Sequence, residues 1–217
     1  MSSRSIDTER LDAGPAITLV VASVAFAVAL FTRRTGNVWL GVALASLVSI
    51  GAAWLTNASP SVELGRGLAR ETALGAIAGA VMALATQLVA PVALRLVPGA
   101  EAEVDALYAN LAHPPGPIAA LPVLALAVVA EELVWRGVAM ELLAERPWWV
   151  AVGAAALLYA LPQIASGSWL LVALALACGL AWGAMRRWRG GLVAPITTHF
   201  VWNLAIFVLW PIRSQGY

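Results

Sequence analysis

Apolar stretches long enough to cross a lipid bilayer fill most of this 217-residue sequence and limit its fold more than any other feature. A helix needs about 20 apolar residues to cross the hydrocarbon core. About seven such stretches follow one another, at residues 16–31, 38–55, 72–97, 118–144, 148–164, 169–185 and 192–210. We therefore predict an all-α, polytopic bundle of about seven transmembrane helices.

The composition indicates that lipid is the main solvent of this chain. Hydrophobic residues make up 61% of it and charged residues 12%, which is too little polar surface for a soluble domain of this size. We predict a polar tail at residues 1–15 and a single transmembrane domain at 16–217. The lone Cys178 excludes a disulfide framework. The net charge of +1 is dispersed between the apolar stretches, so no nucleic-acid partner is expected.

Arginines are distributed unequally between the two sides of the predicted bundle. The N-terminus and the loops after the second, fourth and sixth spans share one side, which holds Arg4, Arg10, Arg66, Arg70, Arg146, Arg186, Arg187 and Arg189. The opposite side holds Arg33, Arg34, Arg95 and Arg213. By the positive-inside rule we predict that the N-terminus lies in the cytoplasm and the C-terminus outside. We expect the membrane to be a prokaryotic cytoplasmic membrane.

Two further patterns concern helices and their packing. Between the third and fourth spans, Val104, Leu107, Tyr108 and Leu111 recur at helical spacing, which predicts a short helix lying in the membrane interface. It is either a passive connector or a gate for substrate.

Gly75 and Gly79 in the third span, like Gly179 and Gly183 in the sixth, have the GxxxG spacing that allows helix backbones to approach closely.

Three ionisable residues lie near the middle of the fourth span, which is otherwise almost wholly apolar. Such side chains cost about 2.5 to 3.5 kcal/mol each at the centre of a membrane helix, so they usually face a cavity or a partner. Glu132 and Arg136 are four residues apart and are expected to pair on one face of the helix. Glu131 is rotated by about 100° from Glu132 and is left without a partner. It is either a general base or part of a structural ion-pair cluster.

Polar residues recur in two later spans at depths compatible with that of Glu131. His199 and Asn203 in the seventh span are four residues apart and share a helix face. Tyr159 and Gln163 lie near the outer end of the fifth span. We expect these side chains to converge on one cavity enclosed by the fourth, fifth and seventh spans.

These residues resemble two motifs of the CAAX-protease and bacteriocin-processing family of intramembrane proteases. Its first motif is two Glu, three residues and an Arg, which Glu131-Glu132-Leu-Val-Trp-Arg136 matches. Its last motif is a His followed four residues later by Asn, as in His199-Phe-Val-Trp-Asn203. The resemblance covers roughly the last hundred residues, at about 118–210.

The middle motif of the family is an aromatic residue followed four residues later by His. Here the corresponding stretch is Tyr159-Ala-Leu-Pro-Gln163, so the aromatic residue is present and the His is replaced by Gln. The resemblance implies an endopeptidase in which Glu131 activates water and His199 and Asn203 hold the oxyanion, with Glu132 and Arg136 orienting the site. Gln163 retains an amide donor but cannot transfer a proton as His does.

The resemblance also implies a membrane-anchored protein or peptide as substrate, with a CAAX-type terminus, a leader peptide or a C-terminal sorting signal as the classes. We expect no cofactor, because a zinc site would need a second intramembrane His and an amide is a poor zinc ligand. A catalytically inactive scaffold that binds similar peptides is the main alternative, suggested by Gln163. A transporter is less favoured, because no paired repeat is found.

Overall fold

The computed structural model describes residues 13–58 and 67–212, and within them every regular element is helical. The first twelve residues of the predicted polar tail, together with Arg66 and Arg213, lie outside the described residues. The helices are α1 (Gly14–Phe31), α2 (Val38–Leu55), α3 (Leu68–Leu96), α4 (Ala100–Leu111), α5 (Leu121–Glu131), α6 (Ala139–Leu142), α7 (Trp148–Ala160), α8 (Trp169–Arg189) and α9 (Val193–Leu204).

Four helices continue into tighter or wider turns. A π-helical segment, Glu132–Val138, joins α5 to α6, and a second one, Ala205–Leu209, extends α9. A 3-10 segment, Leu161–Ser166, extends α7. Short 3-10 turns also follow α1.

All seven predicted spans are helical, with ends within a few residues of those expected. Five of the described helices are long and apolar enough to cross a membrane by length and composition. The segment Val193–Leu209 is apolar but shorter. The segment from Leu121 to Leu142 is interrupted by Glu131, Glu132 and Arg136, the same residues that suggested a site. The polytopic helical bundle predicted from the sequence is confirmed.

Local sequence explains where several helices begin and end. The side chain of Asn37 accepts hydrogen bonds from two backbone amides of the first turn of α2. Ser168 caps α8 in the same way, through the amide of Leu171. Gly190 ends α8 in the left-handed conformation that favours glycine.

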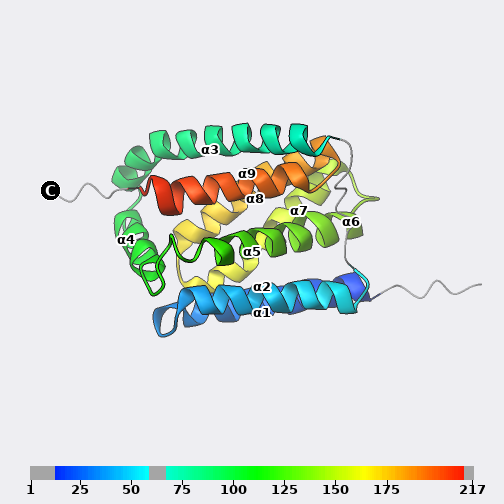
Figure 1. The fold of residues 1–217 in the computed structure, drawn as a ribbon, viewed down its shortest axis with the longest axis horizontal. Helices are drawn as coiled ribbons and strands as arrows, with labels where there is room; N and C mark the ends of the chain where they lie inside the picture. Colours follow the sequence, from blue (N-terminus) through cyan, green and yellow to red (C-terminus); the bar gives the residue numbers. More distant parts are fainter. Residues whose placement is uncertain (1–12, 59–66, 213–217) are drawn as a thin grey trace, which may run out of the picture.

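The helices form an elongated bundle in which α1 and α2 pair along one side and α3 and α9 pair along the other (Figure 1). Helix α5 lies between these pairs, and α7 and α8 pack against each other behind it (Figure 1). Helix α4 closes one end and α6 lies at the opposite end. The residues of the predicted site therefore lie in the interior of the bundle.

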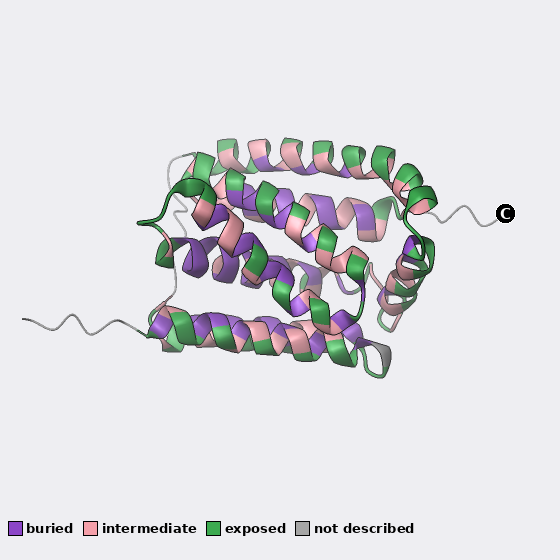
Figure 2. Ribbon diagram, turned by 180° about the vertical axis from the view of Figure 1, so that it is seen from behind, coloured by how far each residue is buried: buried purple, intermediate pink, exposed green. Residues whose placement is uncertain are grey.

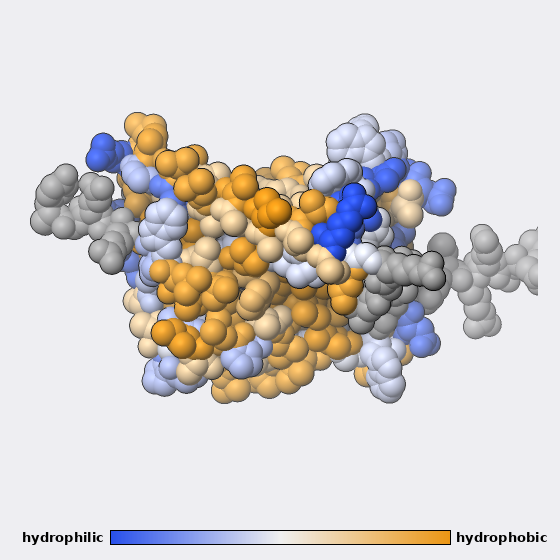
Figure 3. Space-filling view, turned by 45° about the horizontal axis from the view of Figure 1, so that its top comes forward, coloured by the Kyte–Doolittle hydropathy of each residue, from blue (hydrophilic) through white to orange (hydrophobic). Residues whose placement is uncertain are grey.

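Burial follows the pattern of a membrane protein. Buried positions face the inside of the bundle and exposed positions the outside (Figure 2). Many exposed side chains are large and apolar, among them Phe31, Leu55, Leu96 and Leu161. Figure 3 shows hydrophobic residues over the middle of one face and hydrophilic residues towards its ends. Such a surface is stable only where lipid covers its apolar part.

Helix α3 approaches α9 closely along the GxxxG pair. A Cβ atom at Gly75 would lie 2.6 Å from the carbonyl oxygen of Ala194, and one at Gly79 would lie 2.6 Å from that of Thr198. Only Gly75, Gly79 and Ala83 are buried in this helix. The contact therefore depends on the absence of side chains.

The short helix predicted between the third and fourth spans is present as α4. Its residues Val104 and Leu111 are buried. The indole of Trp39 donates to the carbonyl oxygen of Leu111 at 3.1 Å, and the hydroxyl of Tyr108 donates to that of Ile206 at 2.9 Å. Burial raises the pKa of the Tyr108 hydroxyl, so this donor stays protonated at neutral pH. Helix α4 is thus fastened to α2 and to the end of α9.

Replacing Gly79 by alanine is expected to destabilise the protein, because the added Cβ would lie 2.8 Å from the Cβ of Val201 as well as against the Thr198 carbonyl. Overpacking of this kind costs about 1 to 3 kcal/mol. Thermal unfolding of the purified variant in detergent measures the loss. Gly153→Ala is the control, since no described atom outside the neighbouring backbone of its own helix lies within 4 Å of its Cβ position. Equal losses in both variants would contradict the close contact.

Candidate active site

The fourth span changes from an α-helix to a π-helix at the residues that the sequence singled out. Glu131 ends α5, and Glu132 and Arg136 lie in the π-helical segment Glu132–Val138. Widened turns of this kind occur frequently at functional sites, because they re-aim side chains within a helix. Sequence reasoning had assumed an uninterrupted α-helix here.

Glu132 is the centre of a fully buried charge network. Its Oε1 lies 3.2 Å from Nη1 of Arg136 and 2.8 Å from Nδ1 of His199. Glu132 is 0% exposed, Arg136 1% and His199 2%. The network joins the π-helical segment to α9, and a carboxylate so deeply buried requires such partners.

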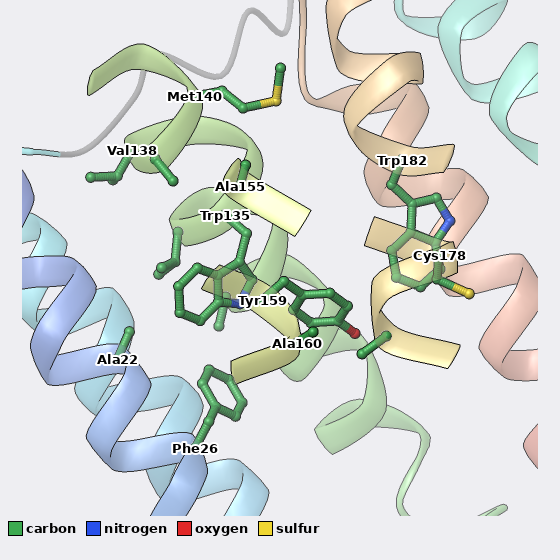
Figure 4. Close-up of a cluster of buried hydrophobic side chains, with 14 of the residues drawn as sticks. Ala22, Phe26, Trp135, Val138, Met140, Ala155, Tyr159, Ala160, Cys178 and Trp182 are labelled. Carbon is green, nitrogen blue, oxygen red and sulfur yellow. The ribbon is translucent and has the colours of Figure 1, made fainter. Parts of the chain in front are cut away.

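Aromatic rings enclose the same network. The indole of Trp182 stacks on His199 with centroids 3.6 Å apart and an angle of 17° between the planes. The guanidinium of Arg136 lies 4.5 Å from the ring centroid of Tyr159 and 5.2 Å from that of Trp182. In Figure 4, Trp135 and Trp182 lie on opposite sides of Tyr159. The rings exclude water from one side of the charges and fix the plane of the imidazole.

Glu131 points to a different place from Glu132. The hydroxyl of Tyr159 donates to its Oε2 at 3.1 Å, and Nε2 of His199 lies 3.7 Å from the same oxygen. Its side chain is 15% exposed, in contrast to the sealed Glu132. His199 thus lies between two carboxylates, one on each ring nitrogen.

A cavity of about 170 Å³ brings the predicted residues together. Five of them line it: Glu131, Tyr159, Gln163, His199 and Asn203. Glu132 and Arg136 do not line this cavity and lie behind it. No hydrogen bond from the side-chain amide of Gln163 or Asn203 to another described residue is formed, so both amides remain available to a ligand.

Sequence reasoning missed the contribution of Trp182. Most tryptophans of the chain lie near span ends, as expected of interfacial anchors, but Trp182 is 1% exposed and lines the cavity beside His199. Trp182 lies close to the predicted end of its span, four residues before Arg186, so no signal in the sequence distinguished it from an interfacial anchor. Cys178 lines the same cavity one turn earlier on α8.

A larger and almost wholly apolar cavity of about 390 Å³ adjoins the first. It lies between α3, α4, α8 and the end of α9. Six residues line both cavities: Leu107, Leu171, Leu174, Cys178, Trp202 and Phe207. An apolar group bound in the larger cavity would therefore reach the polar one.

A comparison with known protein families shows what part of the chain is similar to. Residues 114–205 match the model of the family described as type II CAAX prenyl endopeptidase Rce1-like. Over these residues, which make up less than half of its length, the chain is similar to this family. The match spans every predicted site residue, from Glu131 to Asn203, and confirms the resemblance read from the two motifs. No curated protein and no solved structure gives a significant match to the chain.

The Rce1-like family is a family of endopeptidases, which supports peptidase activity for this integral membrane protein. Helices α1, α2, α3 and α4 lie outside the matched range. Among the residues that the structure describes, no three His, Cys, Asp or Glu side chains are grouped as ligands of a metal ion.

Replacing Arg136 by methionine is expected to cost about 3 to 5 kcal/mol of stability, because it leaves the carboxylate of Glu132 buried with one partner fewer. Adding Glu132→Gln should recover part of the loss, since the charge is then removed. Thermal unfolding of the single and double variants measures the coupling. Arg95→Gln serves as the control, because Arg95 is exposed. A loss no larger than in this control would show that the network is not stabilising.

Proposed function

We propose that this chain is an intramembrane endopeptidase that hydrolyses a peptide bond in a membrane-associated protein or peptide. The supporting observation is the carboxylate of Glu131, which faces a polar cavity inside an apolar bundle and has His199 and Tyr159 beside it. A carboxylate in this position is suited to take a proton from water. The Rce1-like match supports the same class of reaction.

In the proposed reaction, Glu131 accepts a proton from a water molecule while the water oxygen adds to the peptide carbonyl carbon. The carbonyl oxygen becomes an oxyanion, which Asn203 stabilises by donating from its amide. His199 contributes through Nε2, the nitrogen nearest to Glu131, and donates from it in the doubly protonated form. Glu131 then returns the proton to the leaving amine as the carbon–nitrogen bond breaks.

The other residues of the cavity are assigned supporting roles. Tyr159 holds the carboxylate of Glu131 through its hydroxyl group. Glu132 and Arg136 fix the orientation of His199 from behind. Gln163 lines the cavity and offers its amide to the substrate backbone or to the attacking water.

We also propose that the reaction needs no metal ion. This proposal is supported by the side chains that could act as metal ligands in this chain. Its one intramembrane His, His199, already has a carboxylate beside each ring nitrogen. Glu132, the nearest second carboxylate, is paired with Arg136. Activity should therefore survive treatment with a zinc chelator.

The substrate is proposed to place its apolar part in the larger cavity and its scissile bond in the polar one. A CAAX-type terminus, a leader peptide and a C-terminal sorting signal all have an apolar portion beside a cleavage site. The shared walls of the two cavities support this arrangement.

Replacing Glu131 by glutamine is expected to reduce processing of an anchored substrate by several orders of magnitude, because the amide cannot accept a proton. Processing is followed in membranes or proteoliposomes by the size of the product, with and without chelator. Glu101→Gln, which removes an exposed acid on α4, should leave the rate unchanged. Processing at the wild-type rate in Glu131→Gln and Glu131→Ala would exclude this mechanism.

The second candidate function is that of an inactive, peptide-binding relative of the peptidases, which the altered middle motif suggests. The Gln163→His variant distinguishes this candidate from an active enzyme. If the wild-type chain processes no candidate substrate and this variant does, the chain is an inactive relative of the peptidases. Activity in the wild-type chain that depends on Glu131 establishes the peptidase.

Replacing Ala93 by phenylalanine is expected to slow processing mainly by raising KM, because the larger side chain would occupy part of the apolar cavity that Ala93 lines. The kinetic constants for substrates with large and small apolar portions measure the effect. Ala80→Phe is the matched control on the same helix, since Ala80 is exposed and lines neither cavity. Equal effects of both substitutions would argue against this binding site.

A further inference from the structure

A third cavity, of about 280 Å³, lies where α6, the start of α7 and the end of α8 meet. This is the end of the bundle opposite α4 (Figure 1). Its lining includes Arg146, Arg186, Arg187, Glu141 and Trp148, and we name it the arginine cavity. It shares no lining residue with the two cavities of the proposed peptidase site.

The arginine cavity has a clear excess of positive charge. Arg186 approaches Glu141 at 3.6 Å, but that carboxylate is 49% exposed, and such pairs are weak. Arg146 and Arg187 are exposed and form no ion pair with a described carboxylate. By contrast Arg189, at the same end of α8, is held by Glu71 at 2.5 Å and lies outside the cavity. Three guanidinium groups around one hollow suit a phosphate.

The position of the cavity indicates which phosphate it meets. Trp148, Trp149 and Trp188 are largely exposed at this end of the bundle, and exposed tryptophans mark the level of the lipid headgroups. The arginine bias predicts that this end faces the cytoplasm, where basic pockets between membrane helices bind anionic headgroups. The positive-inside bias explains why arginines occur at this end of the bundle. It does not explain why three of them line one cavity together with Trp148.

Arg186 connects the arginine cavity to the helix that carries the buried charge network. Its Nε donates to the carbonyl oxygen of Arg136 at 3.1 Å, within the π-helical segment. Its Nη1 donates to the carbonyl oxygen of Gly190, at the end of α8. A phosphate that engages the outer side of this guanidinium would therefore help to fix the π-helical segment.

We propose that the arginine cavity binds the phosphate of an anionic phospholipid and that the bound lipid stabilises the π-helical segment through Arg186. Arg146 and Arg187 supply the charge at the mouth of the cavity, and Trp148 packs against the glycerol backbone. This site is independent of the proposed peptidase activity.

The test compares phosphatidylglycerol with phosphatidylcholine bound to the purified full-length chain, by native mass spectrometry and by thermal unfolding in mixed micelles. The wild-type chain should retain phosphatidylglycerol preferentially and unfold at a higher temperature in its presence. Arg146→Gln combined with Arg187→Gln should weaken binding by about tenfold or more. Arg95→Gln, which removes an exposed arginine outside this cavity, should bind as the wild type does.

Three results would overturn the proposal: equal retention of the two lipids, the same loss in Arg95→Gln as in the double variant, or displacement of the lipid by millimolar inorganic phosphate, which would indicate a small-anion site. The Glu131→Gln variant should bind phosphatidylglycerol as the wild type does, so that failure of the peptidase proposal and failure of this one are separate outcomes. Both substituted arginines are exposed, and circular dichroism confirms that the variants are folded.

Discussion

The buried carboxylate of Glu132 is the constraint on which the arrangement of the interior depends. A charge that is 0% exposed in a membrane bundle is tolerable only if partners surround it, and here the partners come from two elements, Arg136 in the π-helical segment and His199 in α9. Because Glu132 occupies Nδ1 of the imidazole, Nε2 is turned towards Glu131 and the cavity. The network thereby determines both the packing of the two helices and the direction in which the candidate catalytic histidine points.

The sequence was sufficient to predict the helical membrane bundle, the approximate ends of its helices and five of the residues that line the polar cavity. Each of these follows from a local signal: an apolar run, an arginine or proline at its end, or a polar residue where lipid would be expected. The convergence of Glu131, Tyr159, Gln163, His199 and Asn203 needed the motif spacing as well, because depth along separate helices does not fix rotation about their axes. Their chemical roles remain predictions.

Other features depend on packing between distant segments and left no local signal. The π-helical segment Glu132–Val138 holds Glu132 and Arg136 in the interior of the bundle, and residue propensities give no indication of it. The stacking of Trp182 on His199 joins α8 to α9 and requires both helices in place. The two cavities beyond the polar site are likewise spaces between helices. They appear only when side chains far apart in the sequence meet.

The close approach of α3 to α9 has a consequence for the apolar cavity. The buried residues of α3, Gly75, Gly79 and Ala83, all lie before Thr86, whereas the helix from Thr86 onwards supplies Val89, Ala90 and Ala93 to the cavity wall and has no buried position. That wall is one helix thick, with lipid on its outer side. For this part of the molecule, the membrane acts as a structural neighbour as well as a solvent.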